Sequence, residues 1–162
     1  MPKQRLMTSI YLCDGEKILM LYRQGSSVAS DMWIGSAGGH FEQDELGDAQ
    51  ACVLREMEEE LGIKETQLRD LQLRYITLRR TKGEIRVNHY FFASLPGGQD
   101  MQLSSNEGLL RWFDRSELPS LTMPYSAQYM IAHYLAQGKH DSQIYVGTAD
   151  GERVTFSPLP ET

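Results

Sequence analysis

Apolar positions along the chain fall into short runs, and several of these runs are separated by a pair of turn-forming residues. This pattern is typical of β-hairpins, because two alternating strands that flank such a pair can reverse direction in a tight turn. The paired runs and their turns are 6–13 and 17–23 around Asp14 and Gly15, 71–79 and 86–95 around Lys82 and Gly83, and 144–147 and 153–156 around Asp150 and Gly151. We therefore predict three hairpins.

Two other stretches have the signals of helices. Asp48 is a good N-cap for a helix that runs to about Leu61, where Gly62 stands as a C-terminal stop. An amphipathic pattern over 126–137 predicts a second helix that Gly138 closes. The mixture of predicted strands and helices indicates an α/β or α+β fold.

The remaining segments are shorter and rich in small or polar residues. We expect a polar connector at 25–30, a short strand at 33–39 that leads into a loop, a loop at 96–105 and a short strand at 109–113. No repeat, low-complexity segment or linker divides the chain. Its length of 162 residues therefore predicts a single domain, 1–162.

Composition excludes several classes of protein. An apolar fraction of 41% with 23% charged residues is ordinary for a globular protein and argues against a disordered or fibrous chain. No window has the 18 or so apolar residues of a membrane span, and we see no convincing signal peptide. The two cysteines, Cys13 and Cys52, suggest a reducing compartment more than a disulfide-linked secreted fold. We therefore expect a cytoplasmic protein without a membrane partner.

The net charge of −6 is concentrated in one segment. Residues 42–60 contain eight acids and the single base Arg55, so this segment carries −7 and the rest of the chain +1. A dense acidic patch repels itself unless a counter-charge is present. The absence of a basic surface pattern argues against binding to a nucleic-acid polymer.

Helical periodicity places three of these acids on one side of the first predicted helix. Glu56, Glu59 and Glu60 share about a third of the circumference, whereas Glu58 falls outside the cluster and is expected to be solvated. The core face of the same helix should consist of Leu54, Met57 and Leu61. Two small residues on the acidic side, Ala49 and Cys52, should leave space above the carboxylates.

A cluster of like charges has two interpretations. Like charges one turn apart destabilise a helix by roughly 0.2 to 0.5 kcal/mol per pair, and Arg55 can neutralise or orient only one of the three acids. Carboxylate oxygens suit Mg²⁺ or Mn²⁺, whereas zinc would require His or Cys at ligand spacing. A merely solvated acidic face explains the helix alone equally well.

A longer motif decides between these interpretations. Residues 38–63 read GGHFEQDELGDAQACVLREMEEELGI, and residues 55–63 match every defined position of R-E-U-x-E-E-x-G-U, where U is aliphatic. This is the second half of the Nudix box, so the chain resembles the Nudix hydrolase superfamily and its MutT-like members. The resemblance implies a Nudix-type α/β/α sandwich with a mixed β-sheet, which fits the predicted element order.

The first half of the box departs from the family pattern. Gly39 and Glu45 have the expected G-x5-E spacing, but nine residues instead of seven separate Glu45 from Arg55. We infer a two-residue insertion in the loop before the helix. The metal-binding half is unaffected, and the roles of Glu42 and Glu45 stay open.

The resemblance also implies roles for individual residues. Glu56, Glu59 and Glu60 are expected to bind Mg²⁺, with Mn²⁺ as a substitute, and a backbone carbonyl at Gly38 or Gly39 is expected to complete the metal site. Arg55 should orient a glutamate. Several family members carry a further glutamate on the loop before a strand equivalent to 109–113, which in this chain is Glu107. Glu107 and Glu59 are then competing candidates for the base that activates water.

Substrate contacts are assigned from position and residue type. Arg23 ends a predicted strand shortly before the box and is the first choice for phosphate among Arg23, Arg79, Arg80 and Arg86. His40, beside the glycine pair, is a second candidate. Trp33, Phe41 and Trp112 could stack on a base, although packing in the buried core is the more common use of such residues. His89, His133 and His140 show no catalytic pattern and are expected to be structural or exposed.

By resemblance, the expected reaction converts a nucleoside triphosphate and water to a monophosphate and pyrophosphate. The box is similar to that of bacterial Nudix proteins that act on oxidised purine nucleotides such as 8-oxo-dGTP. Two alternatives stay open: hydrolysis of ADP-ribose or another nucleoside diphosphate linked to a second group, and a catalytically silent nucleotide-binding module that regulates a partner. Family members are often dimers, so a homodimer is compatible with the resemblance.

Overall fold

The structure, a computed structural model, describes residues 1–24 and 31–162. The described residues form a nine-stranded mixed sheet and two α-helices. The strands are β1 (Lys3–Asp14), β2 (Lys17–Arg23), β3 (Met32–Ile34), β4 (Ala37–His40), β5 (Arg69–Thr81), β6 (Glu84–Ser94), β7 (Leu109–Asp114), β8 (Tyr145–Ala149) and β9 (Val154–Pro158), and the helices are α1 (Ala49–Leu61) and α2 (Tyr125–Ala136). The predicted connector at 25–30 lies outside the described residues.

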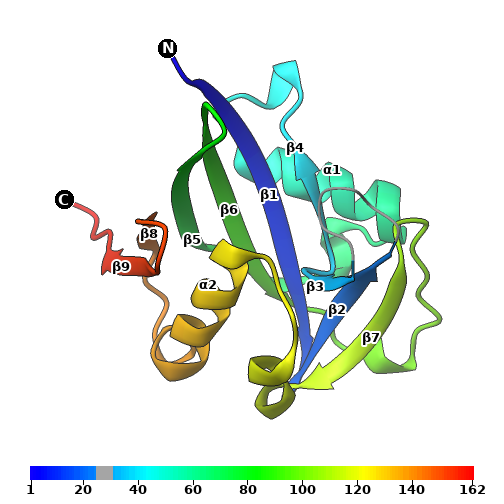
Figure 1. Cartoon of the computed structure of the whole chain (residues 1–162). Helices are drawn as coiled ribbons and strands as arrows, with labels where there is room; N and C mark the ends of the chain where they lie inside the picture. Colours follow the sequence, from blue (N-terminus) through cyan, green and yellow to red (C-terminus); the bar gives the residue numbers. More distant parts are fainter. Residues whose placement is uncertain (25–30) are drawn as a thin grey trace.

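The long strand β1 is the branch point of the sheet. The main strand order is β3-β2-β1-β6-β5-β8-β9, with β4 added on β1 and β7 added on β2. The first part of β1 pairs with β4, from Met7 to Ile10, and its end pairs with β2, from Leu12 to Asp14. The pairs β1–β6 and β5–β8 are parallel, and the other pairs are antiparallel. This divergence separates β2 from β4 and opens the sheet beside β1 (Figure 1).

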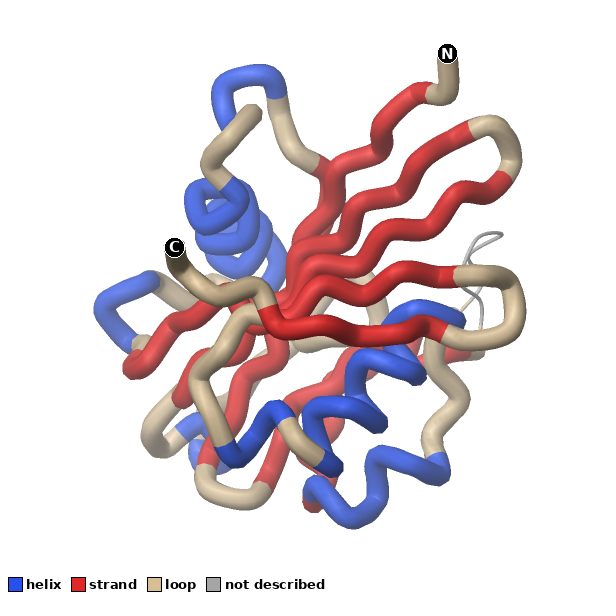
Figure 2. The backbone as a smooth tube through the Cα atoms, turned by 90° about the vertical axis from the view of Figure 1, so that its left-hand side faces the viewer, coloured by secondary structure: helices blue, strands red, loops and turns tan. Residues whose placement is uncertain are grey.

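The two helices cover opposite faces of the sheet (Figures 1 and 2). Strand alternation produces two cores: Ile10 packs in the core that contains Met57 of α1, and Tyr11 packs in the core that contains Met130 of α2. All four of these side chains are at most 1% exposed. The expected α/β/α sandwich with a mixed sheet is therefore confirmed.

The predicted hairpins and helix ends are found with small differences in length. The three hairpins form as β1–β2, β5–β6 and β8–β9, all antiparallel. Asp48 caps α1, because its carboxylate accepts a hydrogen bond from the Ala51 N–H at 3.1 Å. Gly62 ends the helix in the left-handed conformation, with φ of 69°, and donates its N–H to the Glu58 carbonyl.

The prediction of one strand over 33–39 is wrong, because the chain changes partners within this stretch. β3 pairs with β2 and β4 pairs with β1, with a break at Gly35 and Ser36. The fully buried Ser36 hydroxyl donates to the Leu19 carbonyl at 2.6 Å and accepts from the Leu12 N–H at 3.0 Å. It therefore satisfies backbone groups at the point where β1 and β2 diverge.

The second helix ends slightly earlier than expected. α2 ends at Ala136, and Gly138 begins a short 3₁₀ turn, Gly138–His140, instead of capping the helix. A Cβ at Gly138 would collide with the Tyr75 hydroxyl, so packing explains this glycine. In the described part of the chain, no helix combines the length and apolar character needed to cross a bilayer.

Candidate active site

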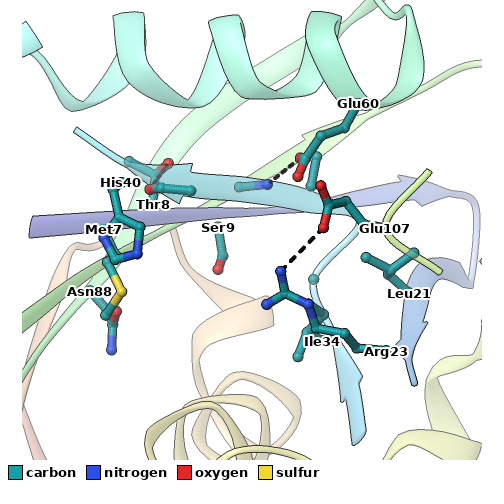
Figure 3. A pocket seen from close by; sticks show the side chains of 14 residues that line it. Met7, Thr8, Ser9, Leu21, Arg23, Ile34, His40, Glu60, Asn88 and Glu107 are labelled. Atoms are coloured by element: carbon teal, nitrogen blue, oxygen red, sulfur yellow. Dashed lines mark hydrogen bonds and ion pairs between the residues drawn. The ribbon is translucent and has the colours of Figure 1, made fainter. Parts of the chain in front are cut away.

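A cavity of about 190 Å³ lies where β1 and β2 diverge, between β4, the end of α1 and the loop that precedes β7 (Figure 3). Segments far apart in the sequence supply its polar groups. These groups include Arg23 from β2, Gly38, Gly39 and His40 from β4, Glu60 from α1 and Glu107 from the loop. The fold thus brings together five of the predicted site residues, namely Arg23, Gly39, His40, Glu60 and Glu107.

Glu60 points from α1 towards β4 and is partly buried in the cavity wall. Its carboxylate accepts a hydrogen bond from the Gly38 N–H at 2.9 Å. Burial raises the pKa of Glu60 to about 7, because desolvation outweighs the stabilising Gly38 hydrogen bond and the nearby acids Glu56 and Glu107 add repulsion. A carboxylate in this environment is stabilised by a bound cation.

Glu107 faces the same part of the cavity as Glu60 (Figure 3). Arg23 Nη2 donates to its carboxylate at 3.2 Å, across 84 positions of sequence. The loop lies close against the end of β2, since a Cβ at Gly108 would collide with the Tyr22 carbonyl oxygen. This close approach holds Glu107 beside Arg23.

Arg55 is surrounded by carboxylates on the outer side of α1. Its guanidinium makes two bonds to Glu45, from Nε at 2.6 Å and from Nη2 at 2.9 Å. Nη1 also reaches Glu56 at 2.8 Å, Glu59 at 3.2 Å and Glu42 at 3.2 Å. The expectation that Arg55 serves only one of the three clustered acids is therefore wrong, because guanidinium has five donors in a planar fork.

Glu45 is the best-buried acid of the site, with 5% of its surface exposed. The Arg55 hydrogen bonds lower the pKa of Glu45 to about 2, and the same contact raises the pKa of Arg55. Glu45 lies in a 3₁₀ turn, Gln43–Glu45, and the exposed Leu46 and Gly47 follow it. The sequence left the roles of Glu42 and Glu45 open, although the G-x5-E spacing of Gly39 and Glu45 could have pointed to Glu45 as the partner of Arg55.

Gly39 lets α1 approach β4 closely. A Cβ at this position would lie 2.5 Å from the carboxyl carbon of Glu56. Burial raises the pKa of Glu56, and the hydrogen bond from Arg55 opposes this shift. Glu56 and Glu60 therefore lie on the side of α1 that faces β4, whereas the side chain of Glu59 is 59% exposed at the edge of the cluster.

The predicted core face of α1 is rotated towards Cys52 and Val53. These two residues and Met57 are fully buried, Leu61 is nearly so, and Leu54 is only partly buried. The Cys52 thiol lies 3.4 Å from the Thr8 hydroxyl, so it packs under β4 and does not leave space above the carboxylates as expected. Glu58 is exposed, as predicted.

The donor set around the cavity fits a hard divalent cation. Glu60, Glu107 and Gly39 line the cavity, Glu56 and Glu59 lie near it on α1, and the donors that these five residues offer are oxygen atoms only. Within the described residues, no three His, Cys, Asp or Glu side chains are already gathered as a metal site. Arg55 holds Glu56 and Glu59, and Gly38 holds Glu60, so binding an ion requires these side chains to exchange partners.

The remaining predicted substrate residues differ in position. His40 lines the cavity, and burial together with Arg5, Arg23 and Arg86 lowers its pKa, so its ring is neutral at pH 7. Trp33 packs on Tyr22 and Phe113, with ring centroids 4.8 and 4.7 Å apart. The described structure therefore places Trp33 away from the lining of the cavity, as a core residue.

The other histidines lie outside the cavity. His89 Nδ1 is 3.1 Å from the Met7 carbonyl, and His133 Nδ1 is 2.7 Å from the Tyr75 hydroxyl. His140 is exposed. These positions agree with the prediction that the three residues are structural or exposed.

A second cavity of about 420 Å³ adjoins the first on the α2 side of the sheet. The two cavities share six lining residues, Met7, Ser9, Arg23, Ile34, Gly35 and Asn88. The second one extends to Arg79, Arg86 and the start of α2 at Tyr125. No sequence motif pointed to three of its lining residues, Ser9, Asn88 and Tyr125.

The fold and the acidic cavity define a class of protein: a hydrolase whose α/β/α sandwich presents clustered carboxylates beside a glycine-containing strand. A family model of the NUDIX domain matches residues 3–134. The chain therefore belongs to the Nudix family and is a pyrophosphohydrolase of that family.

Solved structures of Nudix proteins have the same fold. The mutator MutT protein of Bacillus halodurans has a TM-score of 0.63 at 21% identity, over 98% of this chain and 99% of that one. The Caenorhabditis elegans Ap4A hydrolase has a TM-score of 0.61 at 20% identity, over 86% and 99%. The Escherichia coli dihydroneopterin triphosphate pyrophosphohydrolase has a TM-score of 0.62 at 22% identity, over 82% and 94%. A comparison with curated proteins finds no match.

Proposed function

We propose that this protein is a Mg²⁺-dependent hydrolase that cleaves a nucleoside triphosphate to a monophosphate and pyrophosphate. The observation that carries the proposal is the partly buried Glu60 carboxylate, whose pKa is raised to about 7, facing Glu107 across the cavity. Glu56, Glu59, Glu60 and the Gly39 carbonyl would hold the ion, and Mn²⁺ would substitute for Mg²⁺. The bound ion would offset phosphate charge and favour ionisation of the attacking water.

The residues of the chain have separate tasks in this proposal. Arg23 lies at the junction of the two cavities and suits a phosphate oxygen, and His40 as a neutral ring would donate or accept one hydrogen bond to substrate. Glu107 faces the cavity and Glu59 is largely exposed and tied to Arg55, which supports Glu107 over Glu59 as the base that takes the water proton. Arg55 would position the acids and would not touch substrate.

Two classes of substrate are in question. Nucleoside triphosphates, with oxidised purines such as 8-oxo-dGTP among them, are the first candidates because of the motif. Nucleoside diphosphates linked to a second group, such as ADP-ribose, are the second, and the 420 Å³ cavity beside the acidic one supports them because it has the size of a small-molecule site.

The setting of the protein is also part of the proposal. Both cysteines are free and buried, which supports a reducing compartment such as the cytoplasm. The acidic segment disfavours a nucleic-acid polymer and leaves small nucleotides as partners. A homodimer would be detected by light scattering.

A hydrolysis screen tests the proposal. It would compare canonical and oxidised nucleoside triphosphates, ADP-ribose, dinucleoside polyphosphates and nucleotide sugars, with and without Mg²⁺, and would identify the products. We expect Mg²⁺-dependent release of pyrophosphate, a loss of at least about tenfold in Glu60→Gln and wild-type activity in the exposed control Glu58→Gln. Tight nucleotide binding with no turnover of any compound would support the regulatory alternative and reject the enzyme.

A further inference from the structure

Two arginines face each other on neighbouring strands in the wall of the second cavity. Arg79 of β5 and Arg86 of β6 are direct partners in the antiparallel register, and both line the cavity together with Arg23. Like charges directly opposite each other destabilise a sheet. The two arginines therefore favour binding of an anion, just as the acidic cluster of α1 favours binding of a cation.

The described protein neutralises these charges incompletely. Arg79 has no carboxylate partner within 1–24 and 31–162, and its guanidinium lies 4.7 Å from the ring centre of Tyr125. Arg86 pairs with Glu84 at 3.4 Å, but the same carboxylate oxygen also pairs with Arg5 at 3.5 Å. Residues 25–30 contain no acid that could add a partner.

Arginines are the only charged residues in the described lining of this cavity. No acid is among its lining residues, whereas the neighbouring cavity contains Glu60 and Glu107. The start of α2 adds to this effect, because Tyr125 and Ser126 line the cavity and Pro124 gives the helix no side-chain cap. Arginines in the wall of a space of about 420 Å³ suit an anionic group of the substrate.

We propose that the second cavity binds a phosphate carried by the far part of the substrate, beyond the phosphoric anhydride that is cleaved, with Arg79 and Arg86 as its ligands. Among phosphoric anhydrides, a compound that carries a further phosphomonoester beyond the cleaved bond is then a better substrate than the same compound without it. This inference rests on the proposed function for the position of the cleaved bond. The acidic cavity would hold the anhydride. Arg23, at the junction of the two cavities, would contact the part of the substrate between them, and Arg79 and Arg86 would bind the distal phosphate.

Substrates that differ by one phosphate test the inference. The probes are NADPH against NADH, and coenzyme A against its dephospho form, with kcat/KM measured for each. In the wild type we expect the phosphorylated member to be preferred by about tenfold or more. The preference should fall to about twofold or less in Arg79→Gln and in Arg86→Gln. The matched control is Arg80→Gln, which removes the exposed neighbour on the opposite face of β5 and should keep the preference.

A binding measurement in EDTA separates this inference from the proposed reaction. We expect adenosine 2′-monophosphate to bind at least about tenfold more tightly than adenosine, to weaken with added salt and to lose this advantage in Arg79→Gln but not in Arg80→Gln. Equal binding of the two compounds, together with equal kcat/KM within each pair, would overturn the inference even if hydrolysis is Mg²⁺-dependent. Phosphate-selective binding in a protein that hydrolyses none of the probes would keep the anion site and reject the reaction.

Discussion

Arg55 and Glu45 form a two-pronged ion pair, with Nε–Oε2 and Nη2–Oε1 distances of 2.6 and 2.9 Å. Glu45 is buried in the loop before α1, so the pair holds the Arg55 guanidinium in one position. The remaining guanidinium donor can then reach Glu56 and Glu59. Glu45 therefore supports the acidic cluster through Arg55 and has no direct part in the proposed chemistry.

Replacing Glu45 with Gln should destabilise the protein in a pH-dependent way. Removal of one partner of a buried pair costs about 3 kcal/mol, which corresponds to a decrease in Tm of roughly 6 to 12 °C at pH 7. The pKa of Glu45 is about 2 in the folded state against a usual value of 4.5, so its stabilisation is complete above pH 4.5 and is lost as the pH falls towards 2. Thermal unfolding from pH 2 to 7 measures the difference.

The control for this experiment is Glu58→Gln on the exposed side of the same helix. It should leave Tm within about 1 °C of the wild type, because surface substitutions away from such pairs have small effects. A Glu45→Gln protein that is as stable as this control at pH 7 would show that the pair does not stabilise the fold.

Glu60 should give the opposite pH dependence. Its pKa is about 7 in the folded protein against a usual value of 4.5, so ionisation of Glu60 opposes folding. Metal-free protein should therefore lose stability as the pH rises from 4.5 through 7. In Glu60→Gln this decline should be absent. Saturating Mg²⁺ should restore the wild-type stability above pH 7 and have a smaller effect at pH 5, where protons compete. Thermal melts in EDTA and in Mg²⁺ measure both effects, and identical pH profiles of the two proteins would rule out this role of Glu60.

Gly39→Ala should weaken metal binding without unfolding the protein. The new Cβ would lie 2.5 Å from the Glu56 carboxyl carbon, which belongs to a flexible side chain and can move away. We expect Mg²⁺ affinity to fall about tenfold by calorimetry. In a Glu56→Ala background the same change should have little further effect, since the group it displaces is gone. Additive losses in the double variant would show that Gly39 acts by another route.

Substitution of the two candidate bases should separate their roles. Glu107→Gln should lower kcat by about 10²-fold or more, because an amide cannot take a proton from the attacking water. Glu59→Gln should mainly raise the Mg²⁺ concentration needed for half-maximal rate. Single-turnover rates at saturating Mg²⁺ distinguish these effects, and a wild-type single-turnover rate in Glu107→Gln would assign the base elsewhere.

Local signals in the sequence predicted most of the fold. The turn pairs at Asp14 and Gly15 and the caps at Asp48 and Gly62 act on neighbouring backbone, so each element could be placed from a few residues. The break between β3 and β4 was missed because it depends on Ser36 bonding to strands β1 and β2, which are distant in sequence.

The candidate site was predictable where a motif existed and not elsewhere. The positions of Glu56 and Glu60 followed from helical periodicity, and Glu107 followed from the family resemblance, which implies a glutamate on the loop before β7. Cys52 is buried because of the rotation of α1 about its axis relative to β4. Helical periodicity alone does not define this rotation to within one residue. Arg79 and Arg86 lie opposite each other because of the register of β5 and β6. The turn at Lys82 and Gly83 indicates that register only when the bounds of both strands are known.

Titration of Mg²⁺ into metal-free protein by calorimetry tests the central claim most directly, with Glu56→Gln, Glu60→Gln and the exposed control Glu58→Gln measured beside the wild type. If the carboxylates that face β4 hold the ion, the wild type and the control bind Mg²⁺ with the same affinity and both other variants lose at least about tenfold. Equal Mg²⁺ affinity in all four proteins would contradict the account.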